Sequence, residues 1–72
     1  MEQNVRLIAK VLKNASSRKN VNQISTASGI PAEETQEILD NLEQRKLVGS
    51  GGTPRTYFID NPSGLVAYVE EI

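Results

Sequence analysis

Apolar residues recur at helical spacing near the start of the chain. Four of them fall three or four positions apart, which places them on one face of a helix: Val5, Ile8, Val11 and Leu12. Glu2 near the start of this segment and Lys13 near its end both suit the helix dipole. The spacing predicts a first helix over about Glu2 to Asn14, packed under the helices that follow.

A helix-turn-helix spacing comes next. Ile24 and Ala27 lie three positions apart, as the inward residues of a short helix do, and Asn22 is a suitable cap for its start. Gly29 can adopt the left-handed conformation that a sharp turn requires. A third helix is predicted over about Pro31 to Arg45, with these residues facing inward: Thr35, Ile38, Leu39 and Leu42.

The pattern then changes to that of a β-hairpin. Leu47 and Val48 predict the first strand, residues 49–54 form a glycine-rich turn, and residues 56–59 supply a return strand rich in β-branched and aromatic side chains. Val21, a lone apolar residue after a polar loop, is predicted to add a short strand beside this hairpin.

Residues 60–63 break the strand and cap a final helix. Its apolar stripe consists of Leu65, Tyr68 or Val69, and Ile72. This stripe either packs back on the first helix or meets the same helix of a second copy. Because a domain of this size has a small core, we expect a homodimer through the C-terminal helix.

These positions resemble the winged helix-turn-helix superfamily. The residues that carry the resemblance are Ala27, Gly29, Thr35, Leu39, Leu42 and Lys46-Leu47-Val48, with Lys46 standing where a glycine is usual. The fold so implied is α+β and mainly α: a three-helix core, a two- or three-stranded β-wing and a short C-terminal helix, in a single domain over residues 1–72. Members of this superfamily commonly bind DNA.

Composition narrows the alternatives. The 72 residues include no cysteine and no histidine, so disulfides and the commonest zinc ligands are absent from the sequence. We therefore expect neither a metal, a cofactor nor an enzyme activity. The sequence has no long apolar run and no signal-like start, which predicts a soluble cytoplasmic protein away from the membrane. The net charge of −1 argues against a strongly electrostatic binder of nucleic acid.

The hairpin nevertheless supplies candidate DNA contacts. Thr53 and Arg55 lie in or beside a flexible turn, and Tyr57 is suited to stack on a sugar or bond a phosphate. The run Gly52-Thr53-Pro54 followed by Tyr57 also resembles Z-DNA-binding winged-helix domains, although their recognition-helix asparagine and tyrosine correspond here to Gln36 and Asp40. In the alternative, the glycines only close the hairpin, Arg55 is a surface charge, and Tyr57 and Phe58 fill the core.

A second group of candidates lies around the start of the second helix. Cationic, amide and hydroxyl side chains there are natural phosphate anchors: Arg18, Lys19, Asn22, Gln23 and Ser25. The alternative is an ordinary solvated loop with a helix cap.

The outward face of the third helix is acidic. Gln36 is the one candidate for a base contact, among five carboxylates: Glu33, Glu34, Glu37, Asp40 and Glu43. Such a face is a solvated helix surface or a docking surface for a basic protein partner. The sequence therefore predicts a transcriptional regulator that binds double-stranded DNA through its wing and helix-turn-helix. The alternative is a protein–protein adaptor that uses the acidic helix.

Overall fold

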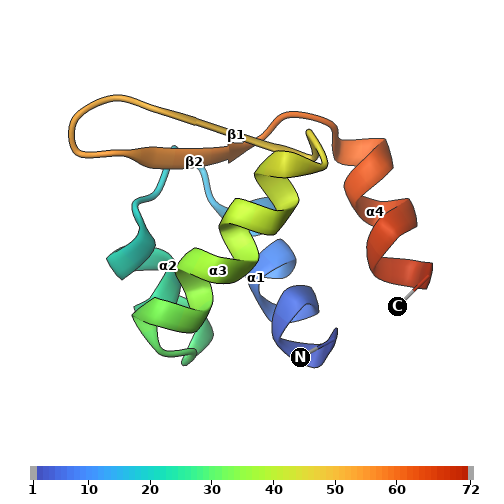
Figure 1. Cartoon of the computed structure of the whole chain (residues 1–72), viewed down its shortest axis with the longest axis horizontal. Helices are drawn as coiled ribbons and strands as arrows, with labels where there is room; N and C mark the ends of the chain where they lie inside the picture. Colours follow the sequence, from blue (N-terminus) through green and yellow to red (C-terminus); the bar gives the residue numbers. More distant parts are fainter. Residues whose placement is uncertain (1, 72) are drawn as a thin grey trace.

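The computed structural model describes residues 2–71, so the prediction for Ile72 lies outside the described part of the chain. Four helices and one two-stranded antiparallel sheet follow one another along the sequence (Figure 1). Their bounds are α1 Glu2–Asn14, α2 Val21–Ser28, α3 Ala32–Gln44, β1 Val48–Gly51, β2 Thr56–Ile59 and α4 Pro62–Glu71.

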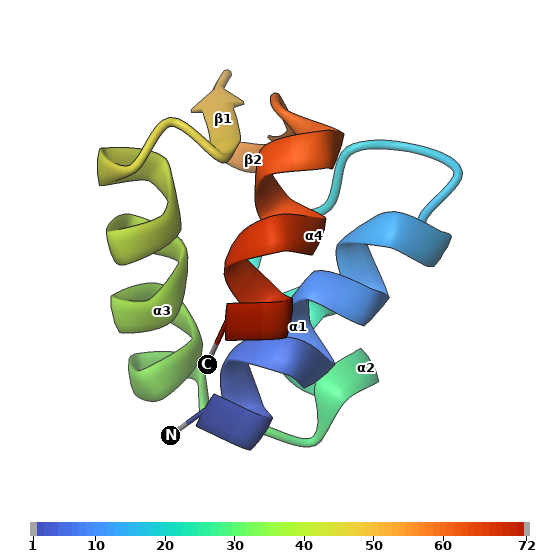
Figure 2. The same ribbon diagram turned by 90° about the vertical axis from the view of Figure 1, so that its right-hand side faces the viewer.

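The helix α1 lies between α2 and α4, and the hairpin crosses one end of this helical body (Figures 1 and 2). The core joins all of these elements. Its buried apolar residues are Val5, Ile8, Ala9, Leu12, Ile24, Ile30, Ile38, Leu39, Leu42, Leu47, Val48, Tyr57 and Leu65. Because the core draws on every element, the hairpin is part of the folded body.

The inward faces predicted for α1 and α3 are largely confirmed. The four predicted residues of α3 are all buried, and Val5, Ile8 and Leu12 of α1 are buried with Val11 packed against them. Thr35 is a polar residue buried among apolar ones. Its hydroxyl donates to the carbonyl of Ile30 at 3.2 Å, so it is not left without a hydrogen-bond partner.

The C-terminal end of α2 was predicted correctly, whereas the residue that caps its N-terminal end was not. Asn20, and not Asn22, caps the helix: its side chain accepts the Gln23 N–H at 2.8 Å, and the Gln23 side chain accepts the Asn20 N–H at 2.9 Å. The prediction for Asn22 was wrong because this reciprocal pairing needs a spacing of three residues. Gly29 does end the helix in the left-handed conformation, with φ of 76°. Ala27 is exposed, which contradicts its predicted inward position.

Lys46 ends α3 in the left-handed region, with φ of 63°. Its position matches the place where the superfamily usually has glycine, and the N–H of Leu47 closes the turn on the carbonyl of Leu42 at 3.0 Å. The left-handed conformation of a residue with a Cβ atom costs about 1–2 kcal/mol. Burial of the adjacent Leu47 and Val48 offsets that cost.

The third strand of the wing is reduced to a single bridge between Lys19 and Tyr57. Their backbones exchange two hydrogen bonds, at 2.7 and 3.3 Å. The prediction of a strand at Val21 was wrong because Val21 already belongs to α2. The first wing strand also begins later than expected and includes the glycines of residues 49–51.

The final helix packs against α1, as one of the two predicted arrangements requires. The side chain of Asn61 accepts the Gly64 N–H at 3.0 Å, and Leu65 is buried while Tyr68 and Val69 pack at the edge of the core. The guanidinium of Arg45, just after α3, lies 4.7 Å from the ring centroid of Tyr68. Among the described residues, no helix combines the length and apolar character needed to cross a membrane.

The two reciprocal hydrogen bonds between Asn20 and Gln23, which form a capping box, can be tested by substitution. Asn20→Ala should lower the free energy of unfolding by about 1 kcal/mol because it leaves a helix N–H without its acceptor. Asn22→Ala is the matched control and should change stability by less than about 0.5 kcal/mol. Urea denaturation of both variants measures the difference, and an equal loss in the two would contradict the assignment of the cap.

Candidate nucleic-acid interface

The two faces of the hairpin are chemically different. Ser50 pairs with Tyr57 across the sheet, and Gly49 pairs with Phe58. Since successive residues of a strand point to opposite faces, Ser50 and Tyr57 face the helices, while Gly49 and Phe58 face away. Tyr57 is 1% exposed and Phe58 is half-buried.

Burial of Tyr57 corrects its expected role as a stacking or phosphate-binding residue. Its ring lies in the core, and its hydroxyl oxygen accepts a hydrogen bond from Nε2 of Gln36 at 2.9 Å. The same Gln36 nitrogen also donates to Oδ1 of Asp40 at 2.8 Å. Tyr57 therefore has no free face for a sugar, and a base contact from the Gln36 amide nitrogen would have to break these two bonds.

Phe58 forms the outer face of the hairpin. It lies over Gly49, where a Cβ atom would come within 2.5 Å of the ring, so this close approach requires glycine. The guanidinium of Arg18 stacks on the ring at 4.4 Å from its centroid and reaches Gly51 on the other strand. The prediction of Phe58 as a core residue was wrong, and its role as a platform for Arg18 was not foreseen.

Arg55 occupies the inner face of the hairpin beside α3. Its side chain is 61% exposed, its Nε donates to the Ser50 hydroxyl at 3.0 Å, and one terminal nitrogen lies 3.8 Å from a carboxylate oxygen of Glu43. The Ser50 hydroxyl in turn donates to the same Glu43 oxygen at 2.6 Å. The sequence identified Arg55 but gave no sign of its contact with α3.

Some of the candidates around α2 are exposed, whereas others are engaged in hydrogen bonds within the protein. Lys19 is half-buried and pairs through its backbone with Tyr57, while the exposed Asn22 lies in the first turn of the helix. Gln23 belongs to the capping box, and the Ser25 hydroxyl donates to the carbonyl of Ile30. The hydroxyl of Ser25 is therefore committed to the turn between the two helices.

Besides the buried Tyr57, four of the candidates gather at the hairpin: Arg18, Lys19, Thr53 and Arg55. Thr53 is exposed in the turn and precedes a cis peptide bond to Pro54. Arg18 and Arg55 lie on opposite faces of the same two-stranded ribbon, whereas Gln36 lies below it on α3. The geometry thus concentrates the candidate cations at the wing.

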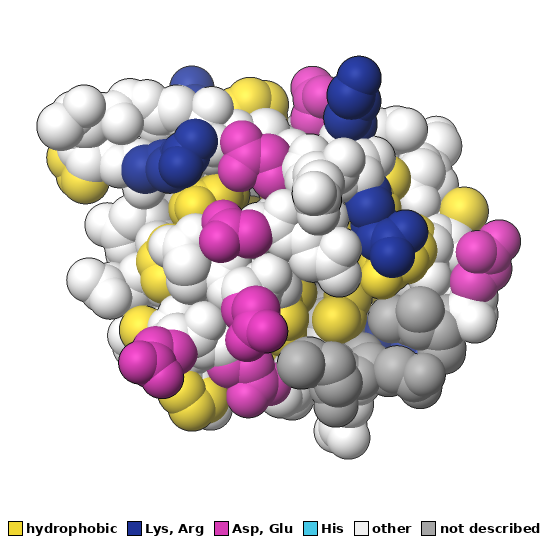
Figure 3. Space-filling view, viewed as in Figure 1, with side chains coloured by type: hydrophobic (Ala, Val, Ile, Leu, Met, Phe, Trp, Pro, Cys, Tyr) yellow, Lys and Arg dark blue, Asp and Glu magenta, His cyan; other side chains and the backbone are white. Residues whose placement is uncertain are grey.

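The outer surface of α3 has the opposite charge. Figure 3 shows acidic side chains in a column over this helix, beneath the basic side chains of the hairpin. The column consists of Glu33, Glu34, Glu37, Asp40 and Glu43, of which Glu34 and Glu43 are half-buried. Glu34 accepts a hydrogen bond from the side chain of Asn4 on α1.

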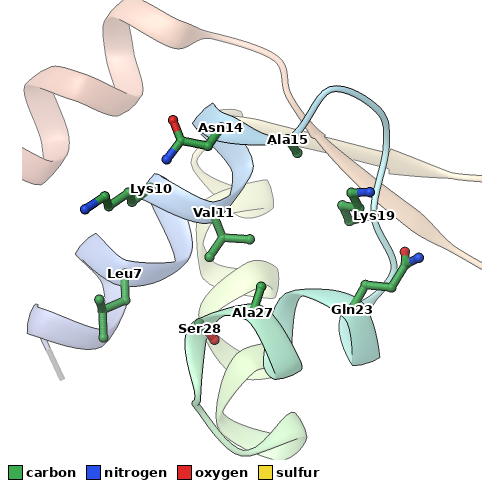
Figure 4. A pocket seen from close by; sticks show the side chains of 9 residues that line it. All are labelled: Leu7, Lys10, Val11, Asn14, Ala15, Lys19, Gln23, Ala27 and Ser28. Atoms are coloured by element: carbon green, nitrogen blue, oxygen red, sulfur yellow. The ribbon is translucent and has the colours of Figure 1, made fainter.

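An open hollow lies between α1 and α2 (Figure 4). Leu7, Val11 and Ala27 give it an apolar floor, and Lys19 and Gln23 come together at one end. A second hollow lies between α1 and α4. Neither has converging acid–base groups, and within residues 2–71 no cluster of His, Cys, Asp or Glu is arranged to hold a metal ion.

The chain was compared with known proteins. It matches no protein-family model and no curated protein sequence. Among solved structures it is similar to a MarR family transcriptional regulator from Silicibacter pomeroyi DSS-3, with a TM-score of 0.66 and 17% sequence identity. The match covers 99% of this chain and 55% of that chain. The fold is therefore a winged helix-turn-helix, as predicted, with a two-stranded wing.

The position of Tyr57 can be tested by removing a single hydroxyl. Tyr57→Phe should lower the free energy of unfolding by about 1 kcal/mol because Gln36 loses a hydrogen-bond acceptor at the edge of the core. Tyr68→Phe, in the other tyrosine, should cost less than about 0.5 kcal/mol. Urea denaturation provides the measurement, and a Tyr57→Phe variant as stable as the parent would argue against this contact.

Proposed function

We propose that this protein is a small cytoplasmic transcriptional regulator that binds double-stranded DNA mainly through its wing. The observation that carries the proposal is the placement of Arg18 and Arg55 on the two faces of one exposed hairpin. A narrow ribbon with a cation on each side suits contacts to phosphates that flank a groove. The fold shared with a transcriptional regulator supports the same conclusion.

The start of α2 supplies further contacts in this arrangement. Lys19 lies beside β2 of the hairpin, bridged to Tyr57, and the exposed Asn22 and Gln23 follow in the first turn of α2. Gln23 holds the cap, so its contribution to binding is to keep this turn in place. Phosphate contacts of this kind position a protein on DNA without selecting a sequence.

The acidic column keeps α3 out of the major groove. Each of its carboxylates would be repelled by phosphates, by about 1 kcal/mol for a pair 4 Å apart even in bulk water. The amide nitrogen of Gln36 is already bonded to Tyr57 and Asp40. Binding led by the wing therefore depends on the backbone, so we expect little sequence preference and a strong dependence on salt.

Removing the wing cation tests this proposal. Arg55→Ala should weaken binding to a short mixed-sequence duplex and flatten the plot of log K against log salt by about one unit, because one phosphate contact is lost. Fluorescence anisotropy over a salt series measures both quantities. Lys46→Gly is the control for the loss of one positive charge, at an exposed position outside the hairpin and the α1–α4 hollow whose left-handed conformation suits glycine, and should leave the slope unchanged.

Failure of the unaltered protein to bind the duplex at low salt would refute the proposal. Equal effects of the two substitutions would show that net charge, and not the wing, determines the affinity.

We also propose that two copies associate through the groove between α1 and α4. Its apolar lining includes Val66, which is 47% exposed, and its rim carries cations from α1: Arg6, Lys10 and Lys13. At the end of α4, Glu70 lines the same groove and Glu71 follows it. A two-fold arrangement would bring these carboxylates of one copy against the α1 cations of the other, which gives complementary charge around an apolar centre.

A charge placed in this groove should separate the two copies. Val66→Asp should shift the protein from dimer to monomer in sedimentation-velocity experiments, because it places a carboxylate in the apolar centre of the proposed interface. Ala67→Asp adds the same residue at an exposed position of the same helix and should leave the dimer intact. A monomeric unaltered protein at all accessible concentrations would exclude the association.

The acidic column favours a second function, that of an adaptor for a basic protein. It predicts a partner with a cationic groove, whose complex depends on Glu37 and Asp40. Binding to DNA at low salt that disappears at moderate salt supports the regulator, whereas a protein that binds no duplex at any salt concentration supports the adaptor.

A further inference from the structure

Arg55 is held by two groups of its own protein. Its Nε bonds the Ser50 hydroxyl at 3.0 Å, and a terminal nitrogen lies 3.8 Å from the Glu43 carboxylate. Because the Ser50 hydroxyl itself bonds that carboxylate at 2.6 Å, the three side chains form one chain from the wing to α3. Glu43 is the member of the acidic column that makes this link.

The Glu43 carboxylate and a DNA phosphate are competitors for the same guanidinium. Both are anionic oxygen acceptors, and an arginine engaged with one has fewer donors for the other. The Arg55 side chain is 61% exposed and the Glu43 side chain 33%, so water and salt screen their attraction. The internal pair is therefore weak enough for a dense array of phosphates to displace.

A single dissolved anion competes poorly with Glu43 for the Arg55 guanidinium. Glu43 is part of the same molecule as Arg55, so its carboxylate is present at a high effective concentration beside the guanidinium. A duplex compensates because it presents one charge per about 1.7 Å of helix axis and engages several cations together. An isolated phosphate has no such advantage.

We propose that Glu43 is a specificity-determining residue of the wing, which withholds Arg55 from isolated anions and yields it to duplex DNA. This inference rests on the proposed DNA-binding function and adds an internal competitor to it. The acidic end of α3 then has a role in binding without entering the groove.

The test compares Glu43→Gln with Glu37→Gln, which removes the same charge from an exposed position of the same helix. Glu43→Gln should bind a short duplex about 2- to 5-fold more tightly, the range expected for loss of an exposed ion pair. Its salt slope should stay close to that of the unaltered protein, because Arg55 contacts one phosphate in both. Glu37→Gln should show a smaller gain and an unchanged slope.

A second readout needs no DNA. The NMR resonance of the Arg55 Nε–H group should move in Glu43→Gln and stay in place in Glu37→Gln. Titration with inorganic phosphate should then shift this resonance in Glu43→Gln at concentrations that leave the unaltered protein unchanged.

The two proposals fail in distinguishable ways. Equal duplex affinities for the two variants would overturn the role of Glu43 while leaving DNA binding intact. Weaker binding by Glu43→Gln would also overturn it, since Glu43 would then orient Arg55 for DNA. If neither the unaltered protein nor Glu43→Gln binds duplex at low salt, the proposed function itself falls and the competition falls with it.

Discussion

The burial of Tyr57 is the interaction on which the arrangement of the wing depends. Its ring fills the core, its backbone exchanges two hydrogen bonds with Lys19, and its hydroxyl accepts from Gln36. One side chain thus ties β2 to the loop before α2 and to α3. An isolated two-stranded hairpin is only marginally stable in water, so this anchorage lets a short wing keep a fixed position.

The same anchorage determines where the charges lie. With Tyr57 turned inward, its neighbour Phe58 must face outward, where its ring supports the guanidinium of Arg18. Arg55, two residues before Tyr57, lies on the inner face, where it contacts Ser50 and Glu43. The wing consequently carries a cation on each face, whereas the outward surface of α3 beneath it is acidic (Figure 3). This separation of charge is what supports the proposed mode of DNA binding, in which the wing makes the main contacts.

The helices could be predicted from the sequence because their periodicity extends over many residues. The bounds of α1 agree with the prediction, and those of α3 differ by one residue at each end. The wing strands are only four residues long, and in β2 two aromatic residues are adjacent. A shift of one residue exchanges the inward and outward faces, so the sequence could not decide between Tyr57 and Phe58.

Contacts between segments that lie far apart in the sequence also could not be predicted from the pattern of residues. The Arg55 to Glu43 contact joins the turn of the hairpin to α3, whereas the missed cap at Asn20 is a local one, three residues before Gln23. The left-handed residue after α3 was the exception. There the resemblance to a known fold had already marked Lys46 as the place where glycine is usual, and the structure gives it a φ of 63°.

Chemical-shift mapping with a short mixed-sequence duplex at low salt shows which backbone N–H groups of the wing and of α3 lie at the DNA, because it observes them all in one experiment. If the wing makes the main contacts, the largest changes fall on Arg18, Lys19 and the residues of 51–55 other than Pro54, with small changes at Glu37 and Asp40. Large changes along the outward face of α3, with the wing undisturbed, would show that the wing is not the DNA-binding element.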